Sequence, residues 1–130
     1  MFKVKSYTAT LAVSDIDRAK EFYTTQLGCD IINEDDNGVA LSVPGSGEML
    51  AIYPSSFAGT NQATVLSFRV EDVAEAVRAL TATGITMEEY DFPGLKTENG
   101  VATLPDGQHV GWFKDPDGNI LAISDNNWSE

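Results

Sequence analysis

The stretch Phe113–Ile123, FKDPDGNILAI, indicates a strand, a tight turn and a second strand. Its centre, Asp115–Asn119, consists of residues that favour turns, and hydrophobic residues flank it on both sides. The second strand has an alanine, Ala122, at its middle position. Whether this alanine belongs to a wider pattern depends on the rest of the chain.

The chain contains two copies of one sequence unit. Val39–Ile52 aligns with Val110–Ile123 at an offset of 71 residues, and both stretches end in Leu-Ala-Ile. Leu11–Ala19 aligns with Phe68–Ala76 at an offset of 57 residues, with matched hydrophobic positions and a shared aspartate. Self-similarity of this kind predicts a repeated structural unit.

Each copy opens with a strand that is followed by a helix. Residues 7–13 alternate in side-chain character, as in a strand that packs on one face. Asp15 stands at the N-cap position of a helix that ends at Gly28. In the second copy Asp72 begins a helix and Gly84 ends it.

Three strands are predicted after each helix, at about residues 29–35, 39–43 and 48–53, and at about residues 85–92, 108–114 and 119–124. Each half therefore has the order β-α-β-β-β, and the fold class is α+β. We expect a single domain over residues 1–130, with modules at about 5–54 and 63–126. The long connection 93–107 has no counterpart in the first half, and its length fits either a lid or a disordered flap.

The charge of the chain limits the classes of partner that it can bind. The chain of 130 residues has 20 acidic and 8 basic residues and a formal net charge of −12. This charge argues against nucleic acid or an anionic membrane as partner and is compatible with a cationic ligand. We recognise no signal peptide and no apolar run of membrane-spanning length. Because Cys29 is the only cysteine, no internal disulfide can form, and we expect a cytoplasmic protein.

The repeat and two motifs resemble the vicinal oxygen chelate superfamily of glyoxalase I, bleomycin-resistance proteins, fosfomycin-resistance enzymes and extradiol dioxygenases. The motif V-x-D-[IV]-x-x-A occurs at Val13–Ala19 and Val70–Ala76, and F-x-D-P-D-G-N occurs at Phe113–Asn119. The resemblance extends over residues 7–125. It implies two tandem modules whose strands form a curved, mixed sheet around a cavity, with the helices outside.

The resemblance also implies four metal-ligand positions, one in the first strand and one in the last strand of each module. Enzymes of the family commonly have His, Gln or Glu at these positions. In this sequence the positions are Thr8, Ala51, Val65 and Ala122. Divalent ions prefer imidazole or carboxylate donors, and three of the four residues offer only hydrocarbon. We therefore expect no metal ion and no other cofactor.

If side chains alternate along the strands, several candidates face one cavity. The candidate ligand-binding residues are Thr8, Thr10, Met49, Tyr53, Ser67, Arg69, Trp112 and Ser124. Trp112 is included because related resistance proteins often place an aromatic residue there, toward the ligand. A floor of small residues with Met49, Tyr53 and Trp112 as walls is typical of a pocket for an aromatic or amphiphilic molecule. The alternative is that these side chains only fill the inside of a curved sheet.

Two polar residues need separate treatment. His109 is the only histidine, and with no second imidazole or evident carboxylate partner we expect it at the surface, directed away from the cavity. Arg69 has an inward position in its strand, where a guanidinium is buried only if it pairs with a carboxylate of the protein or of a ligand.

These observations support three hypotheses about function. The first is a metal-free small-molecule binding protein of the bleomycin-resistance type, a homodimer that sequesters an aromatic or amphiphilic, and in this acidic chain cationic, ligand. The second is a lyase or isomerase resembling lactoylglutathione lyase, with a non-standard or absent metal site. The third is a degenerate domain that serves dimerisation or regulation.

Overall fold

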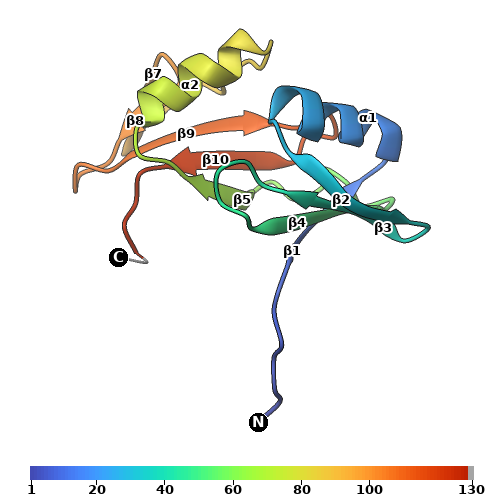
Figure 1. Cartoon of the computed structure of the whole chain (residues 1–130). Coiled ribbons are helices and arrows are strands. Elements are labelled where there is room, and N and C mark those ends of the chain that lie inside the picture. The colour runs from blue at the N-terminus through green and yellow to red at the C-terminus, as the bar shows by residue number, and fades with distance from the viewer. Residues whose placement is uncertain (129–130) are drawn as a thin grey trace. The chain divides into compact units, whose positions relative to one another are not determined.

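The computed structural model describes residues 1–128, and the chain divides into two compact units, Met1–Gly59 and the part from Thr60 onward (Figure 1). Each unit has one helical segment and one mixed β-sheet, which confirms the predicted α+β class. Within residues 1–128 no helix is both long and apolar enough to cross a membrane. The assignment of both units to one domain stays a prediction.

Unit 1 has the predicted order of elements. They are β1 (Ala9–Val13), α1 (Ile16–Glu21), the π-helical turn η1 (Phe22–Gln26), β2 (Asp30–Asp35), β3 (Gly38–Ser42) and β4 (Met49–Pro54). The strands form one sheet in the order β1-β4-β3-β2, in which β1 and β4 are parallel and the other neighbours are antiparallel. The parallel pair brings the first and last strands of the unit together at one edge of the sheet.

The helical segment of unit 1 begins and ends at the predicted residues. The Asp15 carboxylate accepts a hydrogen bond from the Arg18 backbone N–H at 3.1 Å and so caps the first turn. The last turn widens into η1, where the Leu27 N–H donates to the Phe22 carbonyl at 3.2 Å. Gly28 then takes a positive φ of 80°, which ends the helix.

Strand alternation gives the unit 1 sheet two different faces. Leu11, Val13 and Ile52 are buried in the core of the unit, on the face that α1 covers at β4. Thr10 and Ala51, one residue away in each strand, lie on the opposite face. A shift of one residue in the register would exchange the two sets, so the buried aliphatic residues fix which side chains line the other face.

Unit 2 repeats this arrangement and extends it. Its elements are β5 (Thr64–Arg69), α2 (Val73–Ala82), β6 (Asp91–Phe92), β7 (Leu95–Glu98), β8 (Val101–Thr103), β9 (His109–Lys114) and β10 (Ile120–Ser124). The sheet order is β5-β10-β9-β8-β7-β6, with β5 and β10 parallel. The first and last strands of the unit again pair in parallel, as β1 and β4 do in unit 1.

The turn between β9 and β10 is held by one carboxylate. Asp115 Oδ1 accepts hydrogen bonds from the backbone N–H groups of Asp117 at 3.0 Å and Asn119 at 2.9 Å. Asp115 Oδ2 accepts a further bond from the Asn119 side-chain amide at 2.8 Å. Asp115 and Asn119 are both buried, so the DPDGN sequence encodes a turn that satisfies its own polar groups.

The predicted strand at 85–92 is wrong over most of its length, and the connection 93–107 is not a structureless loop. Only Asp91–Phe92 form a strand, β6, whereas β7 and β8 lie within the supposed loop. The edge of β9 is divided between two segments. Ala102 of β8 pairs with Val110, and the Glu88 N–H donates to the Trp112 carbonyl at 2.8 Å.

The turn that joins β7 to β8 explains this error. Asn99 and Gly100 both have positive φ, 54° and 81°, as the two central residues of a type I′ hairpin turn do. Asn-Gly between alternating residues is a strong hairpin signal, and it is present in the sequence at 99–100. The segment around it therefore adds two strands to the sheet of unit 2.

Capping of α2 provides a test of this local structure. The Asp72 carboxylate accepts a hydrogen bond from the Glu75 N–H at 3.1 Å. Because Asp72→Ala leaves that N–H without its partner, we expect it to lower the free energy of unfolding by about 1 kcal/mol. Urea denaturation followed by circular dichroism measures the change. The matched control is the exposed neighbour Glu71→Ala, and an equal effect of both substitutions would contradict the capping role.

Candidate ligand-binding site

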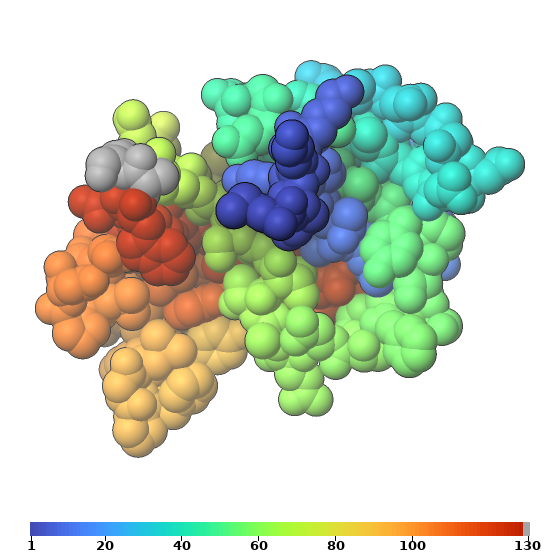
Figure 2. All heavy atoms as spheres, turned by 90° about the horizontal axis from the view of Figure 1, so that it is seen from below, coloured from blue at the N-terminus to red at the C-terminus, as the bar shows by residue number. Residues whose placement is uncertain are grey.

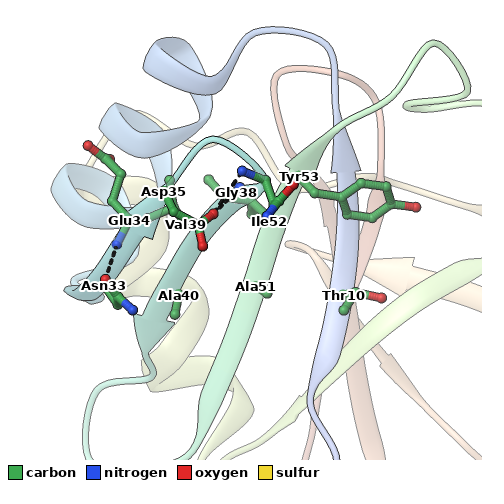
Figure 3. A pocket seen from close by; sticks show the side chains of 11 residues that line it. Thr10, Asn33, Glu34, Asp35, Gly38, Val39, Ala40, Ala51, Ile52 and Tyr53 are labelled. Carbon is green, nitrogen blue, oxygen red and sulfur yellow. Dashed lines mark hydrogen bonds between the residues drawn. The ribbon is translucent and has the colours of Figure 1, made fainter.

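A groove of about 280 Å³ opens on the sheet of unit 1 (Figure 3). It is lined by Thr10, Asn33, Glu34, Asp35, Asn37, Gly38, Val39, Ala40, Ala51, Ile52 and Tyr53. These residues come from all four strands and from the turn between β2 and β3. Two of the predicted ligand-binding residues, Thr10 and Tyr53, are among them.

The floor of the groove is a single row across the sheet. Thr10 pairs with Ala51, Ala51 pairs with Ala40, and Ala40 pairs with Asn33. The two central positions are alanines, so the middle of the row is lower than its polar ends. A small-residue floor between a hydroxyl and an amide can accept a flat apolar group and offer hydrogen bonds at both sides.

Tyr53 forms one wall of the groove. It pairs with Ala12 of β1, and its ring extends toward β1 (Figure 3). The side chain is 41% exposed, so much of the ring is available for contact. Beside it, Gly38 has no side chain, and a Cβ there would collide with the Ile52 carbonyl oxygen and come within 3.3 Å of the Tyr53 Cβ. Gly38 therefore lets the β2–β3 turn approach the base of Tyr53.

The opposite rim of the groove is acidic. The Glu34 carboxylate pairs with Lys20 Nζ at 2.6 Å, and its hydrogen bond raises the pKa of the Lys20 ammonium. Asp35 Oδ1 accepts hydrogen bonds from the backbone N–H groups of Asn37 at 2.7 Å and Gly38 at 3.2 Å. The Asn33 side chain accepts from the Glu34 N–H at 2.8 Å. These bonds fix two carboxylates at the rim, where negative charge favours a cation.

The other two candidates in unit 1 lie outside the groove. Met49 is on the same face of β4 as Tyr53 but pairs with Ser42 and is not among the lining residues. Thr8 precedes β1 and is exposed. Met49 is four positions along β4 from Tyr53, which places it beyond the end of this groove, and its predicted role as a cavity wall stays a prediction.

The four candidate ligand-binding residues of unit 2 lie on one face of its sheet, in two rows of cross-strand neighbours. Ser67 pairs with Ala122, and Ala122 pairs with Trp112. Arg69 pairs with Ser124, which pairs with Val110. Alternation therefore places all four as predicted. Arg69 is exposed, so its guanidinium is not a buried group that requires a carboxylate partner.

The face of unit 2 is partly filled by its own side chains. Ala122 is only 3% exposed and belongs to a buried cluster with Ala102 and Val110, against which Trp112 packs. Leu95 and Leu104 pack on the same cluster. At the centre of unit 2, side chains therefore fill the face of the sheet, as in the alternative to a binding pocket, whereas the groove in unit 1 stays open.

Two aromatic residues that the sequence analysis missed extend the row from Trp112. The rings of Trp112 and Tyr90 meet edge to face, with centroids 5.4 Å apart, and the ring of Tyr90 lies 5.8 Å from that of Phe92. Thr97 fixes Tyr90, because its hydroxyl accepts from the Tyr90 N–H at 2.7 Å. The alternation of Tyr90 and Phe92 was the available signal, but Trp112 lies 20 or more residues away in the sequence.

Phe92 also lines a second hollow, in unit 2. This hollow, of about 680 Å³, is lined by Asp91, Phe92, Pro93, Gly94, Leu95, Lys96, Thr103 and Pro105. It lies beside the hairpin of β6 and β7, and it contains none of the predicted ligand-binding residues. Phe92, which is half-exposed, therefore belongs both to this hollow and to the row of rings with Tyr90 and Trp112.

The four metal-ligand positions implied by the family do not fit a metal ion. Ala51 is on the floor of the groove between Thr10 and Ala40, and Ala122 is in the apolar cluster of unit 2. Val65 in β5 adds a third hydrocarbon side chain. Over residues 1–128, no three His, Cys, Asp or Glu side chains gather where they could hold a metal ion. The residues at these positions thus lack the imidazole and carboxylate donors that a divalent cation needs.

His109 has a carboxylate partner, which corrects the expectation that it has none. Its Nδ1 lies 2.7 Å from Asp125 Oδ2, and its backbone N–H donates to Asp125 Oδ1 at 2.7 Å. These bonds, the backbone one first, lower the pKa of Asp125. His109 does alternate with Trp112 along β9 and so faces away from it, as predicted. A carboxylate on Nδ1 orients the ring and favours the tautomer whose Nε2 accepts protons.

Comparisons with known proteins agree with this architecture. The sequence profile of the Glyoxalase/Bleomycin resistance protein/Dioxygenase superfamily matches residues 6–123. A comparison with curated protein sequences gave no match.

Three solved structures are similar to nearly the whole chain. A bleomycin resistance determinant encoded on the transposon Tn5 is 22% identical, with 95% of this chain and 99% of that chain covered and a TM-score of 0.72. A bleomycin-binding protein complexed with bleomycin is 21% identical, with 95% and 100% covered and a TM-score of 0.70. A superfamily member from Sphaerobacter thermophilus DSM 20745 is 26% identical, with 92% and 96% covered and a TM-score of 0.66.

The hydrogen bonds between His109 and Asp125 at the end of β9 give a pH-dependent prediction. Because the folded-state pKa of Asp125 is below its unfolded value, its stabilisation is present above the unfolded pKa and is lost as pH falls through the folded pKa. Asp125→Asn should lower the free energy of unfolding at pH 7 by about 1 kcal/mol at most. The difference from the native chain should shrink as pH falls below about 4.

Urea denaturation at pH 7 and at pH 3 measures this difference. The control is Asp36→Asn, an exposed aspartate in the β2–β3 turn, which should change stability little at either pH. A difference between Asp125→Asn and the native chain that is the same at both pH values would contradict the assignment.

Proposed function

The chain belongs to the Glyoxalase/Bleomycin resistance protein/Dioxygenase superfamily, and from this membership we propose that it is a metal-free small-molecule binding protein of the bleomycin-resistance type. It sequesters its ligand rather than transforming it. The observation that carries the proposal is the open groove of unit 1, whose floor has an alanine, Ala51, at a position where the resemblance places a metal ligand in the family's enzymes.

The groove favours a ligand that combines a flat aromatic group with positive charge. Ala40 and Ala51 leave room for a ring to lie on the sheet, and Tyr53 offers the face of a second ring. Asp35 supplies negative charge at the rim, whereas Lys20 compensates the charge of Glu34. A cation within about 6 Å of a tyrosine ring gains about 0.5–2 kcal/mol, so ring and carboxylates act in the same direction.

Two similar proteins carry names that agree with this proposal. One is a bleomycin resistance determinant and the other is a bleomycin-binding protein in complex with bleomycin. Their sequence identities to this chain are 22% and 21%, so the ligand of this chain is proposed from its own groove. The proposal includes a homodimer and a cytoplasmic location.

One observation favours a second candidate function, a lyase or isomerase of the glyoxalase kind. His109 is oriented by Asp125 at 2.7 Å, and an imidazole held in this way can serve as a general base. The pair lies on the face of β9 opposite Trp112, outside the groove of unit 1. Binding is preferred because the groove residues need no metal and no proton transfer to hold a ligand.

A matched pair of dyes tests the ligand class. 9-Aminoacridine is a planar cation at pH 7, and acridine-9-carboxylate is a planar anion with the same rings. We expect the cation to bind at least about tenfold more tightly, because the rim is acidic. Fluorescence titration of each dye measures the affinities, and bleomycin is titrated as a competitor. Equal affinities for the two acridines would contradict the charge argument.

Substitutions of Tyr53 test the position of the site. Tyr53→Ala should weaken binding of 9-aminoacridine about 5- to 30-fold, whereas Tyr53→Phe keeps the ring and should bind within about twofold of the native chain. Phe57→Ala, at an exposed aromatic residue outside the groove, is the control.

Metal analysis and metal removal distinguish the proposed binding protein from the alternative, a lyase or isomerase. Elemental analysis of untagged protein should show less than one equivalent of zinc, nickel, manganese or iron per chain, and dialysis against EDTA should leave dye binding unchanged. A stoichiometric ion whose removal abolishes turnover of a substrate would favour the lyase or isomerase instead.

A further inference from the structure

Asp35 is the last residue of β2, at the corner of the groove where the turn to β3 begins. The end of β2 and this turn lie at the surface of the molecule, in cyan at the upper right of Figure 2. The Asp35 side chain is exposed and belongs to the lining of the groove. Its carboxylate is therefore accessible to a molecule that enters the groove.

The two oxygens of this carboxylate have different surroundings. Oδ1 accepts hydrogen bonds from the backbone N–H groups of Asn37 at 2.7 Å and Gly38 at 3.2 Å, so the turn holds the side chain in place (Figure 3). Oδ2 has no hydrogen bond or ion pair with any of residues 1–128. An ionised carboxylate only accepts hydrogen bonds, so Oδ2 is an acceptor that is oriented by the turn and still unused.

Glu34, the other acidic residue of the lining, is placed differently. It alternates with Asn33 and Asp35 along β2, so its side chain leaves the opposite face of the sheet. There its carboxylate pairs with Lys20 Nζ of α1 at 2.6 Å, and Figure 3 shows the side chain directed away from the alanine floor. The carboxylate that a ligand on the floor meets directly is therefore that of Asp35.

Asp35 stands at one end of a second row of residues, beside the floor. Gly38 pairs with Asp35 on one side and approaches the Tyr53 Cβ on the other. The Tyr53 ring extends toward β1, away from Asp35, and Gly38 has no side chain (Figure 3). The row therefore has a gap of two strand spacings, about 10 Å between the Cα atoms of Tyr53 and Asp35, with only backbone beneath it.

The alanine floor, Ala40 and Ala51, adjoins this gap. Each alanine lies two residues along its strand from Gly38 or Tyr53, which is about 7 Å. A flat ring that rests on the two alanines therefore has one edge toward the gap. A charged nitrogen at that edge has the Tyr53 ring on one side and Asp35 Oδ2 on the other.

The chemistry of these two groups distinguishes between kinds of cation. An aromatic ring attracts any cation, including a quaternary ammonium group that carries no hydrogen. A carboxylate oxygen forms a charge-assisted hydrogen bond, roughly twice as strong as a neutral one, only with a nitrogen that carries hydrogen. A nitrogen with an N–H group therefore gains an interaction in the gap that a fully alkylated nitrogen lacks.

We propose that Asp35 determines which cations the groove accepts, and that the ligand is a planar aromatic cation whose charged nitrogen donates a hydrogen bond to Asp35 Oδ2. This inference rests on the proposed function, because it assumes that the groove binds an aromatic cation. It adds the atom that recognises the charge. The ligand class is thus a protonated aryl amine or nitrogen heterocycle, and fully alkylated cations are bound more weakly.

Two acridine dyes separate the hydrogen bond from the charge. 9-Aminoacridine is a planar cation with N–H groups at pH 7, and 10-methylacridinium is a planar cation with the same rings and no N–H. Asp35→Asn retains an oxygen for the turn but puts an uncharged NH₂ donor in the place of Oδ2. It should weaken binding of 9-aminoacridine about 10- to 30-fold and that of 10-methylacridinium about threefold, as measured by fluorescence titration.

Asp36→Asn is the matched control. It removes the same charge from the next residue, which is exposed and does not line the groove. We expect it to change both affinities at most about threefold, which is the effect of a nearby charge in water. Circular dichroism of both variants should match that of the native chain, because the hydrogen bonds of the turn are retained.

A measurement on the native chain does not depend on how the variants fold. The ¹³C resonance of the Asp35 carboxyl carbon, assigned by triple-resonance NMR, reports hydrogen bonding to Oδ2. It should shift when 9-aminoacridine is added and shift much less when 10-methylacridinium is added.

The outcomes distinguish this inference from the proposed function. If the native chain binds neither dye, both are overturned. If it binds both dyes, but Asp35→Asn weakens them equally or the Asp35 resonance does not move, the groove binds cations and only the role of Asp35 is overturned. A larger loss for 9-aminoacridine than for 10-methylacridinium in Asp35→Asn, and not in Asp36→Asn, supports it.

Discussion

The parallel pairing of the first and last strands in each unit is the constraint on which the rest of the structure depends. β1 pairs with β4 and β5 pairs with β10, both in parallel. Parallel neighbours require a connection that leaves the plane of the sheet, and here the connection includes a helix. The helix packs on one face of the sheet, and the strands place aliphatic side chains such as Leu11 and Ile52 on that face. The opposite face is then free to hold small, polar and aromatic residues.

The two units use this free face differently, although both have an alanine at the same place in the last strand. Ala51 lies on the floor of an open groove, because its neighbours across the sheet are Thr10 and Ala40. Ala122 is covered, because Trp112 and the apolar residues of β8 and β9 pack around it. The resemblance to the family's enzymes implies a metal ligand at each of these positions. A methyl group leaves the floor of the groove open in unit 1 and is part of the packing in unit 2.

Much of this architecture is predictable from the sequence, and the failures have a common cause. The period of two along the strands and the caps at Asp15 and Asp72 are local signals, and they located most strands and both helices correctly. Contacts such as that of His109 with Asp125, 16 residues apart, depend on the register of β9 against β10. In this hairpin the register follows from the turn at Asp115–Asn119, so the pair could have been found by counting outward from the turn. The hairpin at Asn99 likewise has a local turn signal, and both signals were overlooked.

The acidic edge of unit 1 illustrates how charges can protect an exposed edge strand from association with its own kind. An exposed edge strand invites pairing with an identical edge, and charged residues on the edge oppose this. Two copies of β2 would bring the carboxylates of Asp30 and Glu34 against like charges, at a cost that the net charge of −12 increases. The acids of β2 would therefore have to be neutralised before a second β2 edge could pair with this one.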